Sequence, residues 1–240
     1  MASISPWIMW QAIDLSRGLV IVAGVWFVAS IGGALGTQLP IHLSPSSMTP
    51  AIHVVVATCL AGMLVVWPLV RLSQPTIPQA IARTAVDALT LACLWQLVLW
   101  PLRLATPWTI DRTLSVDLLA LSSLAAALGF VAAGSAWPHA LSRSLAMIGC
   151  LVIAVGLPVP LAALGFSSGE IASLFPGALT ALTRIVEHPG SLPSDGAWGD
   201  AIARAALHGA ICLVGILIAL FGGGRIPSNA HPTATGRRVG

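Results

Sequence analysis

The sequence predicts an all-α membrane protein with several helices that cross the bilayer. Of its 240 residues, 57% are hydrophobic and 8% are charged, whereas about 25% of the residues in an average soluble domain are charged. The apolar residues form long continuous runs, unlike the alternating segments of roughly ten residues in a membrane β-barrel. Helices are the expected spanning elements, because a helix pairs its own backbone amides and carbonyls in lipid.

The composition also excludes several classes of protein. A soluble monomeric enzyme would need far more polar surface, and a disordered chain would be polar. The eleven basic residues, all Arg, are dispersed along the chain, so the net charge of +3 does not indicate nucleic-acid binding. The four cysteines lie in apolar runs without CxxC spacing, which favours buried side chains over a metal site or disulfides. We expect no cofactor.

The chain begins with a segment typical of an interfacial helix. Residues 3–16 combine Trp7 and Trp10, which suit the membrane interface, with the polar residues Gln11 and Asp14. This helix runs into the first span. It has no basic region and no clean small-residue cleavage site, so we expect the N-terminus to be retained and not removed as a signal peptide.

Six spans follow from the uncharged runs and the helix breakers between them. Pro75 and Pro78 form a turn between the second and third spans. Pro158 and Pro160 should kink or unwind the fifth span near its end. The expected spans cover residues 18–36, 51–70, 79–102, 114–137, 141–166 and 201–221.

An even number of spans places both termini on one side of the membrane. With both termini in the cytoplasm, seven Arg face the cytoplasm and four face the exterior, as the positive-inside rule requires. Residues 1–221 are therefore expected to form one transmembrane domain of a multi-pass cell-membrane protein. Residues 222–240 are rich in Gly, Pro and Ser and are expected to form a disordered cytoplasmic tail.

The longest polar stretch predicts two short amphipathic helices on the outer side, within residues 168–187. Ser167 and Glu170 have the spacing of a capping box, and Pro176 suits the first turn of the second helix. In that helix one face carries Leu179, Leu182, Ile185 and Val186. Both helices are too short to cross about 30 Å of hydrocarbon, so we expect them to dip into the outer leaflet or to lie along it, with their apolar faces buried by that leaflet or by the outer mouth of the bundle.

Two acids within the spans have local basic partners. Asp87 follows Arg83 by four residues, on the same face of a helix, and Asp117 is within reach of Arg103 or Arg112. This pattern favours structural ion pairs over a proton relay, which would need an acid at mid-membrane.

The histidines leave one cofactor alternative open. His53 and His208 would lie at similar depth, as the two axial ligands of a membrane haem must; the other interpretation is a His that faces a polar cavity or the interface. The chain contains no HExxH, GxSxG or P-loop motif. We therefore expect that the protein is not an enzyme.

The order of spans and breakers resembles a known family. The segment LFPGALTALTRIVEHPG, followed by GAWGDAIARAALHGAICLVGILIALFGGG, resembles the end of type-2 ABC exporter permeases, with Pro176, Arg184 and Gly190 at matching positions. The turn SQPTIPQAIARTAVDAL resembles the Pro-containing cytoplasmic turn of that family, where Arg83 enters the third span. The segments LAAALGFVAAGSAW and RSLAMIGCLVIAVGLPVPLAAL are similar to spans four and five of the membrane subunit of the cytochrome-c-maturation haem exporter.

The resemblance implies the permease subunit of an exporter, which works as a homodimer or heterodimer of permeases with a separate ATP-binding subunit. Its implied contacts with that subunit are Trp10, Asp14, Pro75, Pro78 and Arg83. The implied outer gate contains Glu170, Pro176 and Arg184.

Two alternatives to a permease remain. One is a non-transporting membrane anchor or assembly subunit of a larger complex, including a redox complex, which haem absorbance in purified membranes would favour. The other is a membrane enzyme, which the absence of a catalytic cluster in the sequence makes the least favoured.

The distribution of Arg predicts the orientation. Reporter fusions at Gly240 and Gly196 should report the cytoplasm and the exterior respectively, because the loops and termini that carry more Arg stay on the cytoplasmic side of the membrane. The reverse result would overturn the topology and the placement of the outer helices.

Overall fold

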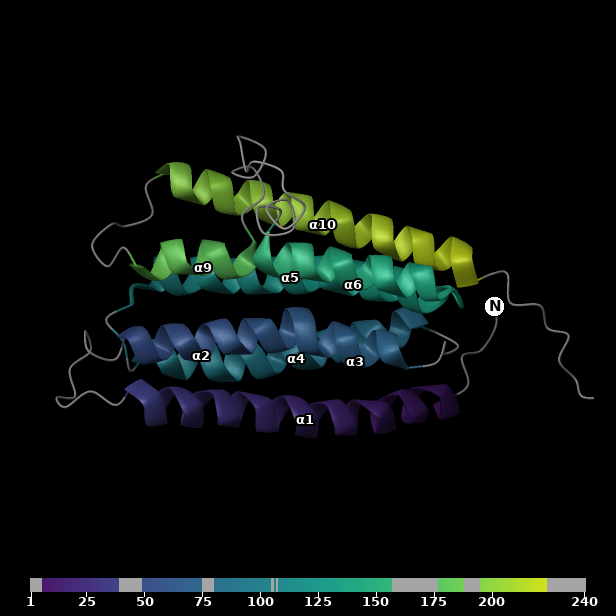
Figure 1. Ribbon diagram of the computed structural model, residues 1–240, viewed down its shortest axis with the longest axis horizontal. Helices are drawn as coiled ribbons and strands as arrows, with labels where there is room; N and C mark the ends of the chain where they lie inside the picture. Colours follow the sequence, from purple (N-terminus) through teal and green to yellow (C-terminus); the bar gives the residue numbers. More distant parts are fainter. Residues whose placement is uncertain are drawn as a thin grey trace, which may run out of the picture.

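The computed structural model describes residues 6–38, 49–74, 80–104, 106, 108–156, 177–187 and 195–223, and this part of the chain is all-α. Its helices form stacked layers (Figure 1). The outer helix α1 lies against α2 and α4, which form the second layer with α3; the next layer holds α5, α6 and α9; and α10 covers α5 on the far side. The first and last described residues lie at the same end of the bundle.

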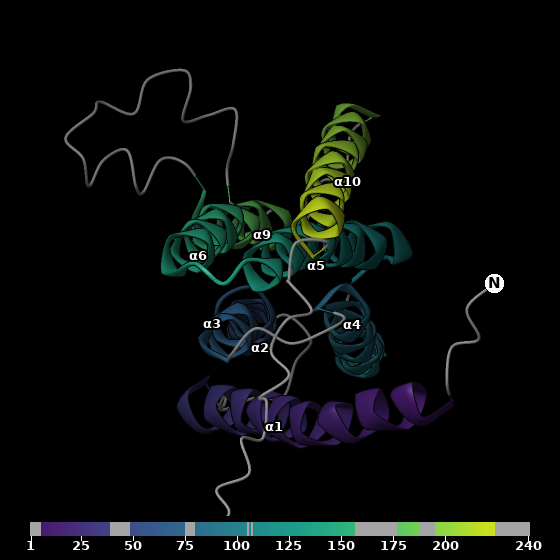
Figure 2. The same cartoon turned by 90° about the vertical axis from the view of Figure 1, so that its right-hand side faces the viewer.

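Helix α1 (Pro6–Gln38) is a single helix of 33 residues. We expected an interfacial helix that runs into the first span, and the structure joins the two segments in one helix, because Ser16 and Arg17 are compatible with a helix interior and no breaker separates them. The apolar part of α1 is Gly18–Ala34. Helices α2, α3 and α4 are seen nearly end-on in Figure 2, whereas α1 lies across the view. Helix α1 therefore crosses these helices obliquely.

The second expected span contains a π-helical turn. Helix α2 (Thr49–Ala61) continues through η1 (Gly62–Val66) into α3 (Trp67–Ser73). The N–H of Trp67 pairs with the carbonyl of Gly62, five residues earlier. Pro68 follows directly and has no N–H, and its ring would clash with a carbonyl in a regular α-helical turn. The wider π turn accommodates this proline.

Helices α4 (Ala80–Leu104) and α5 (Ile110–Ala136) are the third and fourth expected spans. Helix α5 begins four residues earlier than expected, because Thr109 is its N-cap and its side chain accepts a hydrogen bond from the Arg112 amide. The linker to α4 is shorter than predicted for the same reason.

The fifth expected span is interrupted. Helix α6 (Ala140–Val155) ends eleven residues before Phe166, at Gly156, whose φ of 86° breaks the helical path. Helix α9 (Ala178–Glu187) begins where α6 ends, and the backbone of Gly177 packs directly against that of Val155 and Gly156. Pro158 and Pro160, which were expected to kink or unwind this span, lie outside the described part of the chain.

Helix α9 lies inside the bundle. Of the two expected sites of burial, the outer leaflet and the outer mouth of the bundle, the structure shows burial on the bundle: α9 packs against α2, α5 and α6, and its residues Ala178, Ala181 and Leu182 are almost fully buried. The helix itself was expected from its apolar spacing, and its amphipathic face finds burial on protein instead of lipid. The first outer helix and the residues around Glu170 lie outside the described part of the chain.

Helix α10 (Asp195–Gly223) packs almost entirely on α5. The contact is close because glycines face each other: a Cβ on Gly129 would lie 2.7 Å from the Cα of Cys212, and a Cβ on Gly215 would overlap the backbone of Gly129. Such small residues let membrane helices approach closely. The opposite face of α10 is apolar and exposed, with Ile202, Leu213, Val214, Leu220 and Phe221.

Four helical segments of the described chain are long and apolar enough to cross a membrane. They are Pro50–Ser73, Ile81–Leu104, Ile110–Ala136 and Ala201–Gly222. The apolar parts of α1 and α6 are shorter. The chain is thus a helical membrane protein by length and composition.

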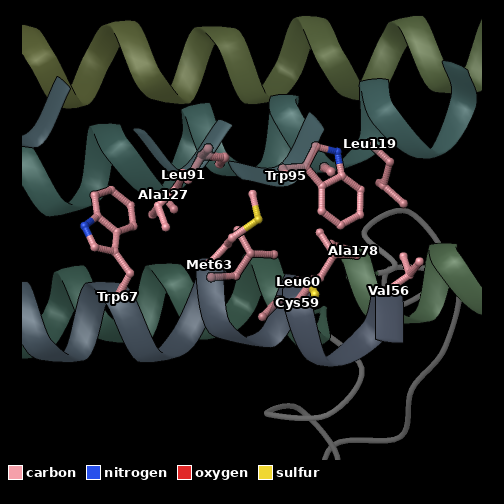
Figure 3. Packing of buried hydrophobic residues seen from close by; sticks show 14 of the residues in the cluster. Val56, Cys59, Leu60, Met63, Trp67, Leu91, Trp95, Leu119, Ala127 and Ala178 are labelled. Atoms are coloured by element: carbon pink, nitrogen blue, oxygen red, sulfur yellow. The ribbon is translucent and has the colours of Figure 1, made fainter. Parts of the chain in front are cut away.

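The core lies between the middle layers (Figure 3). Trp95 from α4 and Met63 from η1 are fully buried at its centre, where they pack among residues of α2, α5 and α9. The core also includes Val56, Cys59, Leu60, Trp67, Leu91, Leu119, Ala127 and Ala178. This packing holds α9 against the uninterrupted helices.

The α5–α10 contact predicts the effect of one glycine substitution. Gly215→Leu should lower the free energy of unfolding by about 1–3 kcal/mol, because the new side chain must displace the α5 backbone. Denaturation with SDS in mixed micelles measures this change. Gly209→Leu is the matched control on α10, since a Cβ there meets nothing within 4 Å. Equal loss of stability in both variants would contradict the close contact.

Candidate functional site

A slot with one polar end lies between α1 and the α2–α3 segment. Its volume is about 320 Å³, and its walls come from α1, η1, α3 and α4. Helix α1 packs on α2 and α4 but makes few contacts with α3, so the slot opens where the oblique α1 diverges from α3. The apolar walls include Val22, Phe27, Val66 and Leu91, and the polar end carries Arg71, Gln74 and Asp87.

A buried ion pair forms the polar end of this slot. Arg71 Nε lies 3.4 Å from Asp87 Oδ2, and both side chains are only 7% exposed. Arg71 Nη1 also donates a hydrogen bond to Gln74 Oε1, at 3.0 Å. Removal of two charges from water has a large desolvation cost, which the mutual attraction in a low-dielectric setting offsets. Charged groups at such positions in membrane helices are candidates for function.

Trp67 lies beside the buried pair and lines the slot. The residue is 4% exposed, and its Nε1 is enclosed by protein atoms. The Asp87 carboxylate is the acceptor close to this Nε1, although the contact falls outside strict hydrogen-bond geometry. An indole N–H in the interior normally finds an acceptor, and here the carboxylate of the ion pair takes that place.

A second tryptophan closes the inner end of the slot. Trp26 of α1 donates a hydrogen bond from Nε1 to the carbonyl of Thr58, at 3.0 Å. Its ring occupies the space above Gly62, where a Cβ would lie 2.5 Å from Trp26 Nε1. A larger residue at position 62 would therefore push α1 away from the π turn.

The structure corrects the expected partners of both acids. Asp87 pairs with Arg71 from the preceding helix and not with Arg83, which acts on the pair only through space. Asp117 accepts hydrogen bonds from Trp95 Nε1 at 3.0 Å and Gln96 Nε2 at 2.8 Å. Sequence spacing favoured partners on the same helix or in the nearest loop, whereas packing between helices supplied these contacts.

The polar network around Asp117 continues to the end of α4. Trp100 Nε1 donates to Gln96 Oε1 at 2.7 Å, and the Arg103 guanidinium lies over the Trp100 ring, 5.8 Å from its centroid. Arg103 therefore makes a cation–π contact in place of the expected ion pair. The network links α4 to α5.

The two histidines considered as haem ligands are on separate layers. His53 is on α2, whereas His208 is on α10, with α5 between these helices (Figure 1). His208 Nδ1 lies 3.2 Å from Ser122 Oγ on α5. The structure therefore does not bring them together as a ligand pair. Within the described residues no group of three His, Cys, Asp or Glu side chains could hold a metal ion.

The residues implied as ATPase contacts are only partly described. Arg83 is half-buried near the start of α4, at the same end of the bundle as the slot's polar end. Trp10 and Asp14 belong to the first turns of α1, but their side chains lie outside the described part, as do Pro75 and Pro78.

The residues implied as an outer gate are described even less. Arg184 is on α9, and its side chain is outside the described part. Glu170 and Pro176 lie outside it altogether.

Sequence reasoning missed the slot, although one signal for it was visible. The tetrapeptide Val66–Leu69 places Trp67 and Pro68 inside an otherwise regular span, with Arg71 three residues later. A proline there requires a local departure from the α-helix, and π turns often occur at functional sites. The divergence of α1 from α3 has no such signal, since it depends on how α1 crosses the bundle.

The buried pair predicts a non-additive effect on stability. Arg71→Met should cost about 3–5 kcal/mol in the free energy of unfolding, because Asp87 stays buried without its cation, whereas replacement of both partners by apolar residues is often neutral. Unfolding in mixed micelles should therefore show R71M/D87L to be more stable than R71M. A double variant as unstable as the sum of the two single variants would contradict the coupling.

No protein family, no curated protein and no solved structure matches this chain in sequence or in fold. Function must therefore be inferred from its own geometry. The features that bear on function are the polar-ended slot, the interrupted helix α6–α9 and the shared end of the bundle at which the first and last described residues lie.

Proposed function

We propose that the chain is the membrane-spanning permease subunit of an ABC-type exporter, which moves a substrate across the membrane with a separate ATP-binding subunit. The observation that carries the proposal is the interrupted helix α6–α9 inside the bundle. The resemblance of spans and breakers to type-2 ABC exporter permeases supports it. The sequence has no P-loop, so ATP hydrolysis is assigned to the partner.

Interrupted helices are typical of transporters. In membranes, non-helical backbone is tolerated only where protein or a cavity surrounds it, and transporters use such half-helices near their substrate sites. Here the amide of Gly156 closes α6 by pairing with Val152, and the amide of Ala181 begins α9 by pairing with Gly177. Each half-helix has its own hydrogen bonds, so one can shift relative to the other without loss of helical structure.

The proposed topology has six crossings and both termini in the cytoplasm. The four long apolar helices provide four crossings, α1 provides another, and α6 with α9 provides the last. These two half-helices contain 16 and 10 residues, and at 1.5 Å per residue their combined rise is about 39 Å. That length is sufficient for a bilayer with a hydrocarbon core of about 30 Å.

The proposed mechanism is alternating access. ATP binding would bring two ATPase domains together, and their different affinity for the two permease states would shift the balance between those states. A shift from 1:99 to 99:1 requires about 5.5 kcal/mol of differential binding. Arg83, Trp10, Asp14, Pro75 and Pro78 are the proposed points of contact with the ATPase. Arg184 on α9, with Glu170 and Pro176, would then belong to the exit on the other side.

A second candidate function is a non-transporting membrane anchor or assembly subunit. The observation in its favour is the exposed apolar face of α10, a helix that packs almost entirely on α5. Another membrane subunit would cover such a face as well as lipid does. Haem absorbance in the purified complex, together with no associated ATPase, would favour this candidate.

Copurification distinguishes the two candidates. The full chain with a C-terminal affinity tag is isolated in mild detergent, and its partners are identified by mass spectrometry. An associated protein with a P-loop, whose ATPase activity rises on reconstitution with the chain, is the expected result. Stable partners that include no ATPase would overturn the permease proposal.

The cytoplasmic turn predicts a coupling defect. Replacement of Pro75 and Pro78 by Ala should lower stimulation of the ATPase several-fold, because the two prolines fix the direction of the turn. Membrane insertion, measured by the yield of folded protein, should not change. Pro101→Ala, near the opposite end of α4, is the matched control. Unchanged stimulation in the double variant would exclude the turn as a contact site.

A further inference from the structure

Helix α10 leans away from the bundle in its first half. Its last turns lie close to α5, whereas its first turns stand apart from that helix (Figure 1, Figure 2). The contact is backbone to backbone at Gly215, where a Cβ would overlap the backbone of Gly129. Nearer the start of α10, the printed contact with α5 is made through the long side chain of His208. The two glycines are therefore the point about which the first half of α10 can tilt.

Two contacts give the register of α10 on α5. His208 Nδ1 lies 3.2 Å from Ser122 Oγ, and these residues are 86 positions apart in the chain. The contact between Gly215 and Gly129 has the same separation. The two helices therefore run parallel with a constant offset. The same offset places residue 204 level with residue 118.

Asp117, next to that level on α5, has one carboxylate oxygen that the described side chains leave open. Trp95 and Gln96 both donate to Oδ1, and no described side chain bonds to Oδ2. The residue is half-buried and lies within the apolar segment Ile110–Ala136. An ionised group in a membrane span is costly without a partner of opposite charge. Oδ2 can accept such a partner while Oδ1 keeps both of its hydrogen bonds.

Arg204 supplies the opposite charge on α10. It is half-buried within the apolar segment Ala201–Gly222 and forms no ion pair with any described side chain. Its guanidinium acts through space on His208, which lies one turn deeper on the same helix and contacts α5. Arg carries a fork of N–H donors that matches a carboxylate. The lean of α10 thus keeps apart two opposite charges, whose attraction is strong away from water.

We propose that the first half of α10 closes on α5 and that an ion pair between Arg204 and Asp117 Oδ2 holds the closed state. Helix α10 tilts about the contact of Gly129 with Gly215, and the two hydrogen bonds of Oδ1 stay in place. Closure links α4, α5 and α10 at the end of the bundle opposite to the first and last described residues. The proposal goes beyond the permease function and does not depend on it. It requires only that α10 lies in a membrane.

Disulfide trapping in nanodiscs measures closure. Leu118 and Ala205 are half-buried, lie one residue apart in level and do not belong to the ion pair. Both are replaced by Cys in a full-length chain whose four natural cysteines are replaced by Ala. Copper phenanthroline is the oxidant. The disulfide between positions 118 and 205 should form, because closure brings these two helix faces together.

Neutral variants of the ion pair should slow this reaction. Asp117→Asn keeps the oxygen that accepts from Trp95 and Gln96 but loses the charge, and Arg204→Gln removes the cation. Each should lower the rate of disulfide formation about tenfold, equivalent to about 1.4 kcal/mol, near the lower end of the range for a hydrogen bond to a charged group. Arg204→Lys keeps the charge and should keep most of the rate.

Asp200→Asn is the matched control. Asp200 precedes Arg204 by four residues on α10, the spacing at which an acid and a base pair within one helix. Its replacement removes one carboxylate but not the one on α5, so the rate should not change. Equal thermal stability of all the variants confirms that they fold. If the two new cysteines prevent folding, unfolding of D117N, R204Q and the double variant in mixed micelles replaces the trapping, and the double variant should lose less stability than the sum of the two single variants.

Four results would overturn the proposal. Absence of the disulfide in a folded chain would show that α10 does not close. Equal rates with and without the two charges would show that the ion pair does not hold the closed state. An effect of Asp200→Asn as large as that of Arg204→Gln would identify the partner of Arg204 on its own helix. Additive losses of stability in D117N and R204Q would show that the two residues do not interact.

Discussion

A helix in hydrocarbon must pair its own backbone amides and carbonyls, and two departures from that rule in the described part of the chain shape this bundle. At Pro68 the missing amide is accommodated by a π turn that stays within the helix. At Gly156 helix α6 ends, and α9 begins next to that point and packs against the core. Both departures are covered by neighbouring helices and not by lipid. Two features bear on function, the slot and the interrupted helix. Each lies where neighbouring helices cover one of these departures.

The distribution of polar groups follows the same constraint. Asp87 and Asp117 are each satisfied by residues of another helix or by a neighbouring tryptophan, so each acid also ties two parts of the bundle together. Asp87 joins α3 to α4 and Asp117 joins α4 to α5. The strength of such contacts in a low-dielectric setting explains why so few charged residues suffice to orient these helices.

The sequence was informative about elements and much less so about their contacts. Apolar runs predicted the helices, but the helix of the fifth span ends at Gly156, before Pro158 and Pro160, which lie outside the described part of the chain. The N-cap at Thr109 moved the start of α5, because a capping side chain outweighs a hydropathy boundary. The partner of Asp87 was not predictable, since Arg71 is on a different helix and only the packing of α3 on α4 brings the two together. The slot depends on the oblique crossing of α1, which no local pattern specifies.

The close approach of Gly156 and Gly177 has a consequence for how this chain can vary. The segment between them begins and ends at adjacent points, because the two glycine backbones are in contact. The length of chain between two such adjacent points affects closure entropy only slowly. Residues can therefore be inserted or deleted there, or a whole module added, without a change in the distance between α6 and α9. The ends of α6 and α9 stay next to each other, so the length and sequence of the segment that joins them can vary.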